Sequence, residues 1–78
     1  MKLIVLNLPR DLTEEGLANL FRTQGKITAH NLVIDNITGL SKGFGFVEMA
    51  SEEDANAAIQ ALHGTKIQKS KIRVKLAN

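Results

Sequence analysis

The sequence predicts an α+β domain in which two helices cover one face of a four-stranded antiparallel sheet. Four short stretches have the β-branched, leucine-rich or alternating pattern of strands, and two longer stretches carry apolar residues at helical spacing. These segments follow one another in the order β-α-β-β-α-β, with no linker or low-complexity tract between them. The chain has 78 residues, which suits one small domain, and we expect that domain to span residues 1–78.

The first half of the chain predicts a strand, a helix and a second strand. Residues 2–8 form an apolar run that Pro9 ends. Thr13 is the expected N-cap of the first helix, and Gly25 is the residue expected to stop it. Residues 27–34, "ITAHNLVI", are typical of a second strand.

The second half predicts a strand, a helix and a closing strand. The turn-rich connection "DNITGLSKG" leads into a strand at residues 43–49. Ser51 is the expected N-cap of the second helix and Gly64 its C-terminal stop. Residues 71–76 alternate strictly and predict the fourth strand. The complete order is that of a ferredoxin-like domain, and right-handed crossovers place both helices on the same face of its sheet.

Alternation along the strands predicts which face the helices cover. In "GFGFVEM", Phe44 and Phe46 point to one side, whereas Gly45, Val47 and Met49 point to the other. The expected core face holds Leu3, Val5, His30, Leu32, Gly45, Val47, Met49, Ile72, Val74 and Leu76. The opposite face holds Lys2, Ile4, Leu6, Asn31, Val33, Lys42, Phe44, Phe46, Glu48, Arg73 and Lys75. Burying the charges of this second face would be costly, so we expect it to stay open.

The predicted open face combines large apolar side chains with lysine and arginine, which indicates a binding surface. An exposed apolar patch of a few hundred Å² is the size at which a patch marks a site of interaction. Cross-strand apolar pairs also stabilise sheets, by about 0.2–1 kcal/mol each. That stabilisation alone does not explain why aromatic rings and cations share one face.

Composition excludes several other classes of site. The chain has no cysteine, so it holds neither a disulfide nor a thiolate metal site, and no apolar run approaches a membrane span. His30 and His63 are far apart in sequence, and no G-x-x-x-x-G-K-[ST] loop is present. We therefore expect no enzyme activity, no cofactor, no metal and no membrane association. The missing cysteines and the absence of a secretory signal favour a cytoplasmic location.

Two motifs carry a resemblance to a known family. "KGFGFVEM", residues 42–49, resembles the RNP1 motif of the RNA-recognition motif family, K/R-G-F/Y-G/A-F-V-x-F/Y, at seven of eight positions. Met49 stands where an aromatic residue is usual. "LIVLNL", residues 3–8, resembles the RNP2 motif and lies on the first strand, where that motif belongs. The likeness extends over essentially the whole chain, which looks like the short single-domain members of bacteria.

The resemblance implies binding of single-stranded RNA on the open sheet face, with bases stacked on the RNP aromatics. Phe46 would stack on a base, Phe44 would take the sugar side or an inter-base position, and Lys42 would pair with phosphate. The second RNP2 position, normally aromatic, is Ile4, so we expect modest affinity. The predicted RNA-binding residues are Lys2, Ile4, Asn31, Lys42, Phe44, Phe46, Arg73 and Lys75.

The sequence also supports a second interpretation of the same face. Ile4, Leu6, Phe44 and Phe46 are also suited to bind a protein partner or a second copy of the chain. The missing RNP2 aromatic favours this protein-interaction module, and the basic rim favours RNA. Single-stranded DNA is a further candidate ligand, and a weak homodimer through the sheet face is a further candidate assembly.

Overall fold

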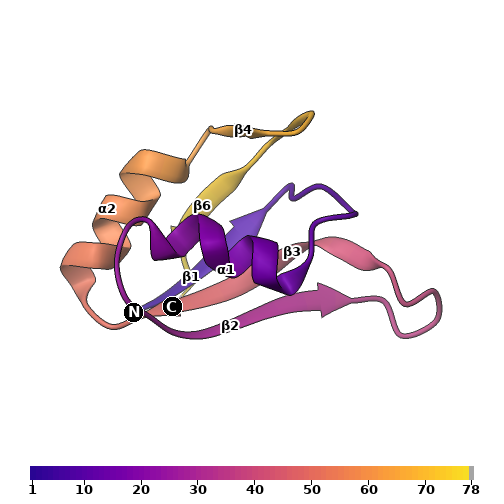
Figure 1. Cartoon of the computed structure of the whole chain (residues 1–78), viewed down its shortest axis with the longest axis horizontal. Helices are drawn as coiled ribbons and strands as arrows, with labels where there is room; N and C mark the ends of the chain where they lie inside the picture. The colour runs from indigo at the N-terminus through magenta and orange to yellow at the C-terminus, as the bar shows by residue number, and fades with distance from the viewer. Residues whose placement is uncertain (78) are drawn as a thin grey trace.

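Two helices pack on one face of a four-stranded antiparallel sheet in the computed structural model, which describes residues 1–77 (Figure 1). The sheet has the order β2-β3-β1-β6, formed by β2 (Ile27–Ile34), β3 (Ser41–Met49), β1 (Lys2–Leu6) and β6 (Arg73–Leu76). The helices are α1 (Glu14–Arg22) and α2 (Glu52–Leu62), and neither has the length and apolar run that crossing a membrane requires. A separate hairpin is formed by β4 (Lys66–Ile67) and β5 (Ser70–Lys71). The predicted ferredoxin-like fold is confirmed.

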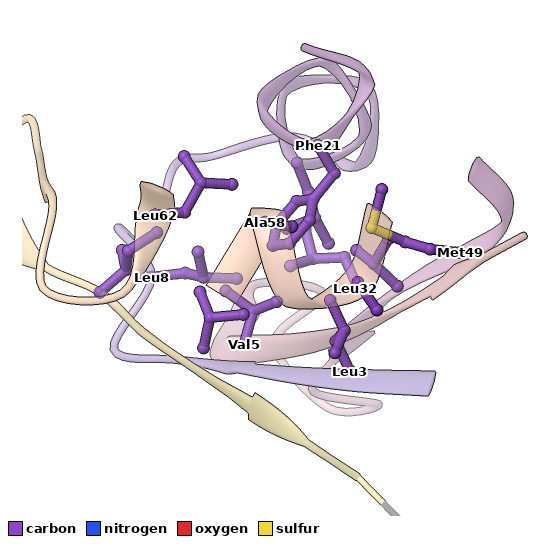
Figure 2. Close-up of a cluster of buried hydrophobic side chains, with 13 residues drawn as sticks. Leu3, Val5, Leu8, Phe21, Leu32, Met49, Ala58 and Leu62 are labelled. Atoms are coloured by element: carbon purple, nitrogen blue, oxygen red, sulfur yellow. The ribbon is translucent and has the colours of Figure 1, made fainter. Parts of the chain in front are cut away.

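The core lies between the helices and the face of the sheet predicted to be buried (Figure 2). Leu3 and Val5 of β1 are fully buried there, together with Leu17 and Phe21 of α1. Gly45 of β3 makes the close packing possible. A Cβ at that position would lie 2.6 Å from the Asn31 carbonyl oxygen and 3.1 Å from Leu17 Cδ2. A side chain at Gly45 would therefore push α1 and β2 away from β3.

Both helices begin at the predicted caps. Thr13 Oγ1 accepts a hydrogen bond from the Gly16 backbone N–H at 3.0 Å, and Ser51 Oγ accepts one from the Asp54 N–H at 3.1 Å. Each such cap stabilises a helix by about 1 kcal/mol. These caps fix the residues at which α1 and α2 begin.

The two helices end differently. Gly64, with φ +81°, follows the end of α2 as predicted. The prediction that Gly25 stops the first helix is wrong, because α1 already ends at Arg22 with Thr23 as its C-cap. Gly25 is needed instead for close packing, since a Cβ there would collide with the side chain of Asp54. The Asp54 carboxylate also accepts a hydrogen bond from the backbone N–H of the next residue, Lys26, at 3.4 Å.

Strand β1 ends two residues earlier than predicted, and β3 begins two residues earlier. The chain turns at Asn7, which has φ +61° and donates a side-chain hydrogen bond to the Lys71 carbonyl oxygen at 2.8 Å. At the start of β3, Ser41 Oγ accepts a hydrogen bond from the backbone N–H of Gly43 at 3.0 Å, where φ is +87°. Glycine suits this left-handed conformation, so a local turn is built into the start of the RNP1-like segment.

The predicted strand at residues 71–76 is only partly correct. Lys71 pairs with Lys66 in the β4–β5 hairpin, and only Arg73–Leu76 joins the main sheet. The expectation that Leu76 lies in the core is wrong, since 47% of this residue is exposed. β6 is an edge strand and Leu76 is its last residue, so fewer neighbours are available to cover it.

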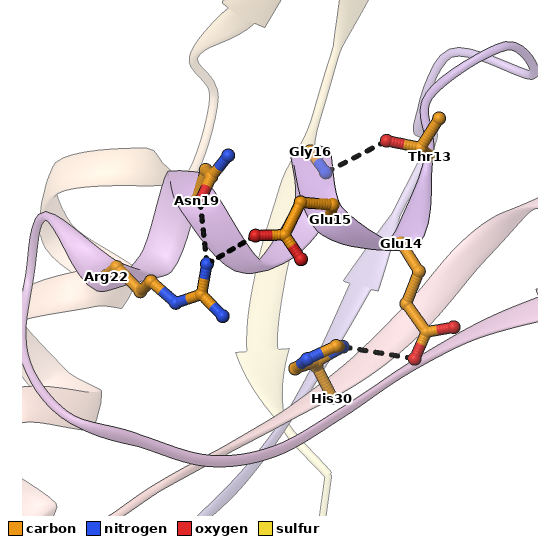
Figure 3. Close-up of polar contacts among 7 residues, drawn as sticks. All are labelled: Thr13, Glu14, Glu15, Gly16, Asn19, Arg22 and His30. Atoms are coloured by element: carbon orange, nitrogen blue, oxygen red, sulfur yellow. Dashed lines mark hydrogen bonds and ion pairs between the residues drawn. The ribbon is translucent and has the colours of Figure 1, made fainter.

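The two histidines have separate structural contacts. His30 Nδ1 lies 3.0 Å from Glu14 Oε1, so β2 is linked to the first turn of α1 (Figure 3). His63 Nδ1 accepts a hydrogen bond from the Val74 backbone N–H at 3.0 Å and links the end of α2 to β6. The same view of α1 shows Arg22 beside Glu15, and the hydrogen bond from its guanidinium holds the pKa of that carboxyl below its ordinary value.

Leu3 and Ile4 are adjacent in β1 and point to opposite faces, so they provide a matched test of the face assignment. We expect Leu3→Ala to lower the free energy of unfolding by about 2–5 kcal/mol, because it leaves a cavity in the core. Ile4→Ala should cost about 1 kcal/mol, the scale of strand propensity at a partly exposed position. Urea unfolding followed by circular dichroism measures both. Equal losses of unfolding free energy in the two variants would contradict the assignment of Leu3 to the core and Ile4 to the open face.

Candidate nucleic-acid interface

A row of four side chains crosses the open face of the sheet, one from each strand. Asn31 of β2 pairs with Phe46 of β3, Phe46 pairs with Ile4 of β1, and Ile4 pairs with Lys75 of β6. Four predicted site residues therefore stand side by side. An aromatic ring and an aliphatic side chain occupy the centre of the row, and an amide and an ammonium occupy its ends.

The two phenylalanine rings are partly exposed and lie next to one another. The centroids of Phe44 and Phe46 are 6.4 Å apart with an interplanar angle of 82°, an edge-to-face arrangement. Lys2 Nζ lies 4.9 Å from the centroid of Phe46. A cation in this position stabilises an exposed ring by about 0.5–1 kcal/mol, whereas a base stacked on it contributes about 1–3 kcal/mol. An incoming base can therefore displace the lysine from the ring.

A shallow pocket of about 140 Å³ adjoins Phe46 at one end of the face. It is lined by Lys2, Ala29, His30, Asn31, Phe46 and Glu48. Glu48 pairs with Lys2 across the strands, which places a carboxylate acceptor and an ammonium donor at the rim. The pocket thus offers hydrogen-bonding groups next to a stacking surface.

The remaining predicted cations lie along two sides of the apolar centre. Arg73 pairs with Leu6 across β6 and β1, and it is exposed like Lys75 two residues further on. Lys42 is exposed near the start of β3, at the end of the face opposite Lys2. All the predicted site residues therefore reach the same face. The resulting surface has apolar and aromatic groups at its centre and cations along its margin, where the Glu48 carboxylate lies beside Lys2.

The loop between β2 and β3 is held in a defined turn by its own hydrogen bonds. Asp35 Oδ1 accepts hydrogen bonds from the backbone N–H groups of Thr38, at 3.0 Å, and Ile37, at 2.8 Å. These bonds hold the pKa of Asp35 below its ordinary value. The turn leaves Ile37 and Leu40 exposed, at 95% and 64%. Sequence alternation could not place these two apolar side chains, because they lie outside the strands.

Arg10 is a further residue near the face that the sequence predictions missed. It lines a hollow of about 260 Å³ with Leu6, Asn7, Leu8, Lys42, Gly43 and Phe44. The residue follows Pro9 in the loop after β1, where neither a strand nor a helical period assigns a face. The sequence feature that could have indicated Arg10 was its position shortly after the RNP2-like segment.

This arrangement suits a flexible, negatively charged ligand with flat apolar groups. The rings can stack on such groups, the cations can pair with its charges, and Asn31 can provide selective hydrogen bonds. Among the described residues, no group of three or more metal-ligating side chains comes together. The rings and the cations on this face indicate binding through stacking and charge.

Known proteins show the same fold and related sequences. The chain is 42% identical to "Glycine-rich RNA-binding protein 1" of Mycosarcoma maydis, over 99% of this chain and 44% of the relative. It is 42% identical to "28 kDa ribonucleoprotein, chloroplastic" of Spinacia oleracea, over 97% of this chain and 33% of the relative. The chain thus spans less than half the length of these relatives. Their names describe an RNA-binding protein and a ribonucleoprotein.

A solved "Sxl-lethal protein/RNA complex" has the same fold, with a TM-score of 0.94 and 38% identity. The superposition covers 99% of this chain and 46% of that one. The named relatives are eukaryotic, so they do not support the expectation of a bacterial-type member. Residues 3–73 match the family described as RNA recognition motif, and the chain therefore belongs to that family.

Proposed function

We propose that the chain binds single-stranded RNA on the open face of its sheet. The observation that carries this proposal is the row formed by Asn31, Phe46, Ile4 and Lys75, because it places a stacking ring between a hydrogen-bonding group and a cation. Family membership and the solved complex of a similar protein with RNA support the same conclusion. Bases would lie over the centre of the sheet, and phosphates would lie along its basic margin.

Phe46 provides the main stacking surface in this mechanism, and Phe44 contacts the adjacent sugar or base. Lys2 leaves the Phe46 ring when a base stacks there and becomes available to a phosphate. Arg73 and Lys75 contact the strand along the β6 edge, and Lys42 contacts it near the start of β3. Stacking and phosphate pairing are both available to single-stranded DNA, so we extend the proposal to DNA as a second ligand.

The absence of a ring at Ile4 sets the expected strength of binding. Ile4 lies directly between Phe46 and Lys75, so a base above it receives apolar contact without an aromatic face. A ring contributes about 1–3 kcal/mol per stacked base, so its absence weakens binding by roughly one to two powers of ten. We infer an affinity in the micromolar range for short RNA.

A protein-interaction module is the second candidate function. The exposed side chains of Ile37 and Leu40 favour it, because they add exposed apolar surface that base stacking does not need. A weak homodimer would use the central apolar side chains of the open face. Failure to bind an eight-nucleotide RNA of mixed sequence at low salt, together with self-association on gel filtration, would favour this second candidate.

We expect Phe46→Ala to weaken binding of that RNA by about 5- to 150-fold, because it removes the central stacking ring. Fluorescence anisotropy measures the affinity. Leu76→Ala is the matched control, since Leu76 is also exposed but lies on the other side of the sheet, and it should leave RNA affinity unchanged. Unchanged affinity in a folded Phe46→Ala variant would refute the stacking mechanism.

Ile4→Tyr should strengthen RNA binding by about tenfold, because it supplies a ring at the centre of the row. The same anisotropy titration measures the change. Thermal unfolding should show a folded domain, since Ile4 is outside the core. A folded variant whose RNA affinity does not rise would show that bases do not stack over β1.

A further inference from the structure

Arg10 lies where the sheet face meets the loops at the end of β1. On one side it lines the hollow of about 260 Å³ that it shares with Lys42 and Phe44. On the other side it lines a wider hollow of about 610 Å³ that includes Lys69 of the β4–β5 hairpin. Arg10 therefore stands between the predicted stacking surface and the β4–β5 hairpin.

Gly43 allows Arg10 to lie against the start of β3. A Cβ on Gly43 would lie 2.8 Å from Arg10 Nε and 3.4 Å from Arg10 Cδ, so any side chain there would displace the arginine. The Leu8 backbone N–H donates a hydrogen bond to the Gly43 carbonyl oxygen at 2.7 Å and ties the two segments together. The Arg10 side chain thus lies close to the Gly43 backbone at the start of β3.

The guanidinium is also free to bind an anion. Within residues 1–77, Arg10 forms no ion pair and no side-chain hydrogen bond, although Asp11 follows it directly. Asp11 lines the wider hollow, and no carboxylate lines the one that Arg10 shares with Lys42. A guanidinium and an ammonium thus face one hollow without a counter-charge. Arginine presents planar paired donors that match the geometry of a phosphate.

We propose that Arg10 binds a phosphate of the RNA strand where the strand passes from Phe44 off the end of the sheet, with Lys42 beside it. This inference rests on the proposed function, because the phosphate belongs to the same strand whose bases stack on the open face. It extends the binding site beyond the sheet to the loop that follows β1. Gly43 has a second role in this site, since it leaves room for the arginine.

The test compares Arg10→Gln with the unmodified protein, using the mixed-sequence eight-nucleotide RNA at several salt concentrations. We expect affinity at low salt to fall by about 3- to 10-fold, as for a partly exposed charge-assisted contact. The slope of log affinity against log salt should become shallower by about 0.7, the value for one lost phosphate contact on a single strand. Arg10→Lys should keep the slope, because it keeps the charge.

Lys26→Gln is the matched control. It removes one exposed positive charge at the opposite end of β3, where the Lys26 carbonyl oxygen accepts a hydrogen bond from the Ala50 N–H. This variant should retain the unmodified slope and affinity. The assignment of Arg10 to a phosphate contact would be overturned if Arg10→Gln bound RNA like the unmodified protein. It would also be overturned if Arg10→Gln lost no more RNA affinity than Lys26→Gln. If the unmodified protein binds no RNA, the proposed function fails, and this inference fails with it.

Discussion

The pairing of β1 with β3 is the constraint on which the rest of the structure depends. These two strands are the centre of the sheet, and their register places Ile4 beside Phe46 on the open face. The same register places Leu3 beside Val47 in the core. A shift of one residue would move every side chain of a strand to the other face. It would expose core side chains and place charged ones beneath the helices. The register that buries the core therefore also determines which side chains lie on the open face.

The division between the two faces also explains how a small domain can carry an apolar binding surface. The core draws on both helices and on the inward positions of the strands, so the outward rings of Phe44 and Phe46 are not needed for it. Those rings can therefore change with modest effect on the fold. Their basic surroundings distinguish the face from a hydrophobic surface suited only to protein contact. Charge at the margin attracts a polyanion, and the rigid strands hold the rings in place for its bases.

Alternation in the sequence was sufficient to predict the central features. In "KGFGFVEM", a side-chain period of two, together with charges that resist burial, assigned Phe44 and Phe46 to the open face and Val47 and Met49 to the core. The helix caps Thr13 and Ser51 were equally local signals, because each acts within one turn of its own helix.

Features that depend on contacts between distant segments could not be predicted in this way. Leu76 continues the alternation of its strand but is exposed at the edge of the sheet. The β4–β5 hairpin interrupts an apparently continuous strand because Lys71 pairs with Lys66. Arg10 gains its position from a glycine more than thirty residues away in sequence. Periodicity carries no information about any of these contacts.

The central claim is that RNA lies across the row Asn31, Phe46, Ile4 and Lys75. The most direct test is an NMR titration of the ¹⁵N-labelled protein with the mixed-sequence RNA, followed through backbone amide shifts. Our account predicts that the largest shifts map to these four residues and their neighbours on the open face, while the exposed sides of α1 and α2 change little. Shifts confined to the helices would contradict it.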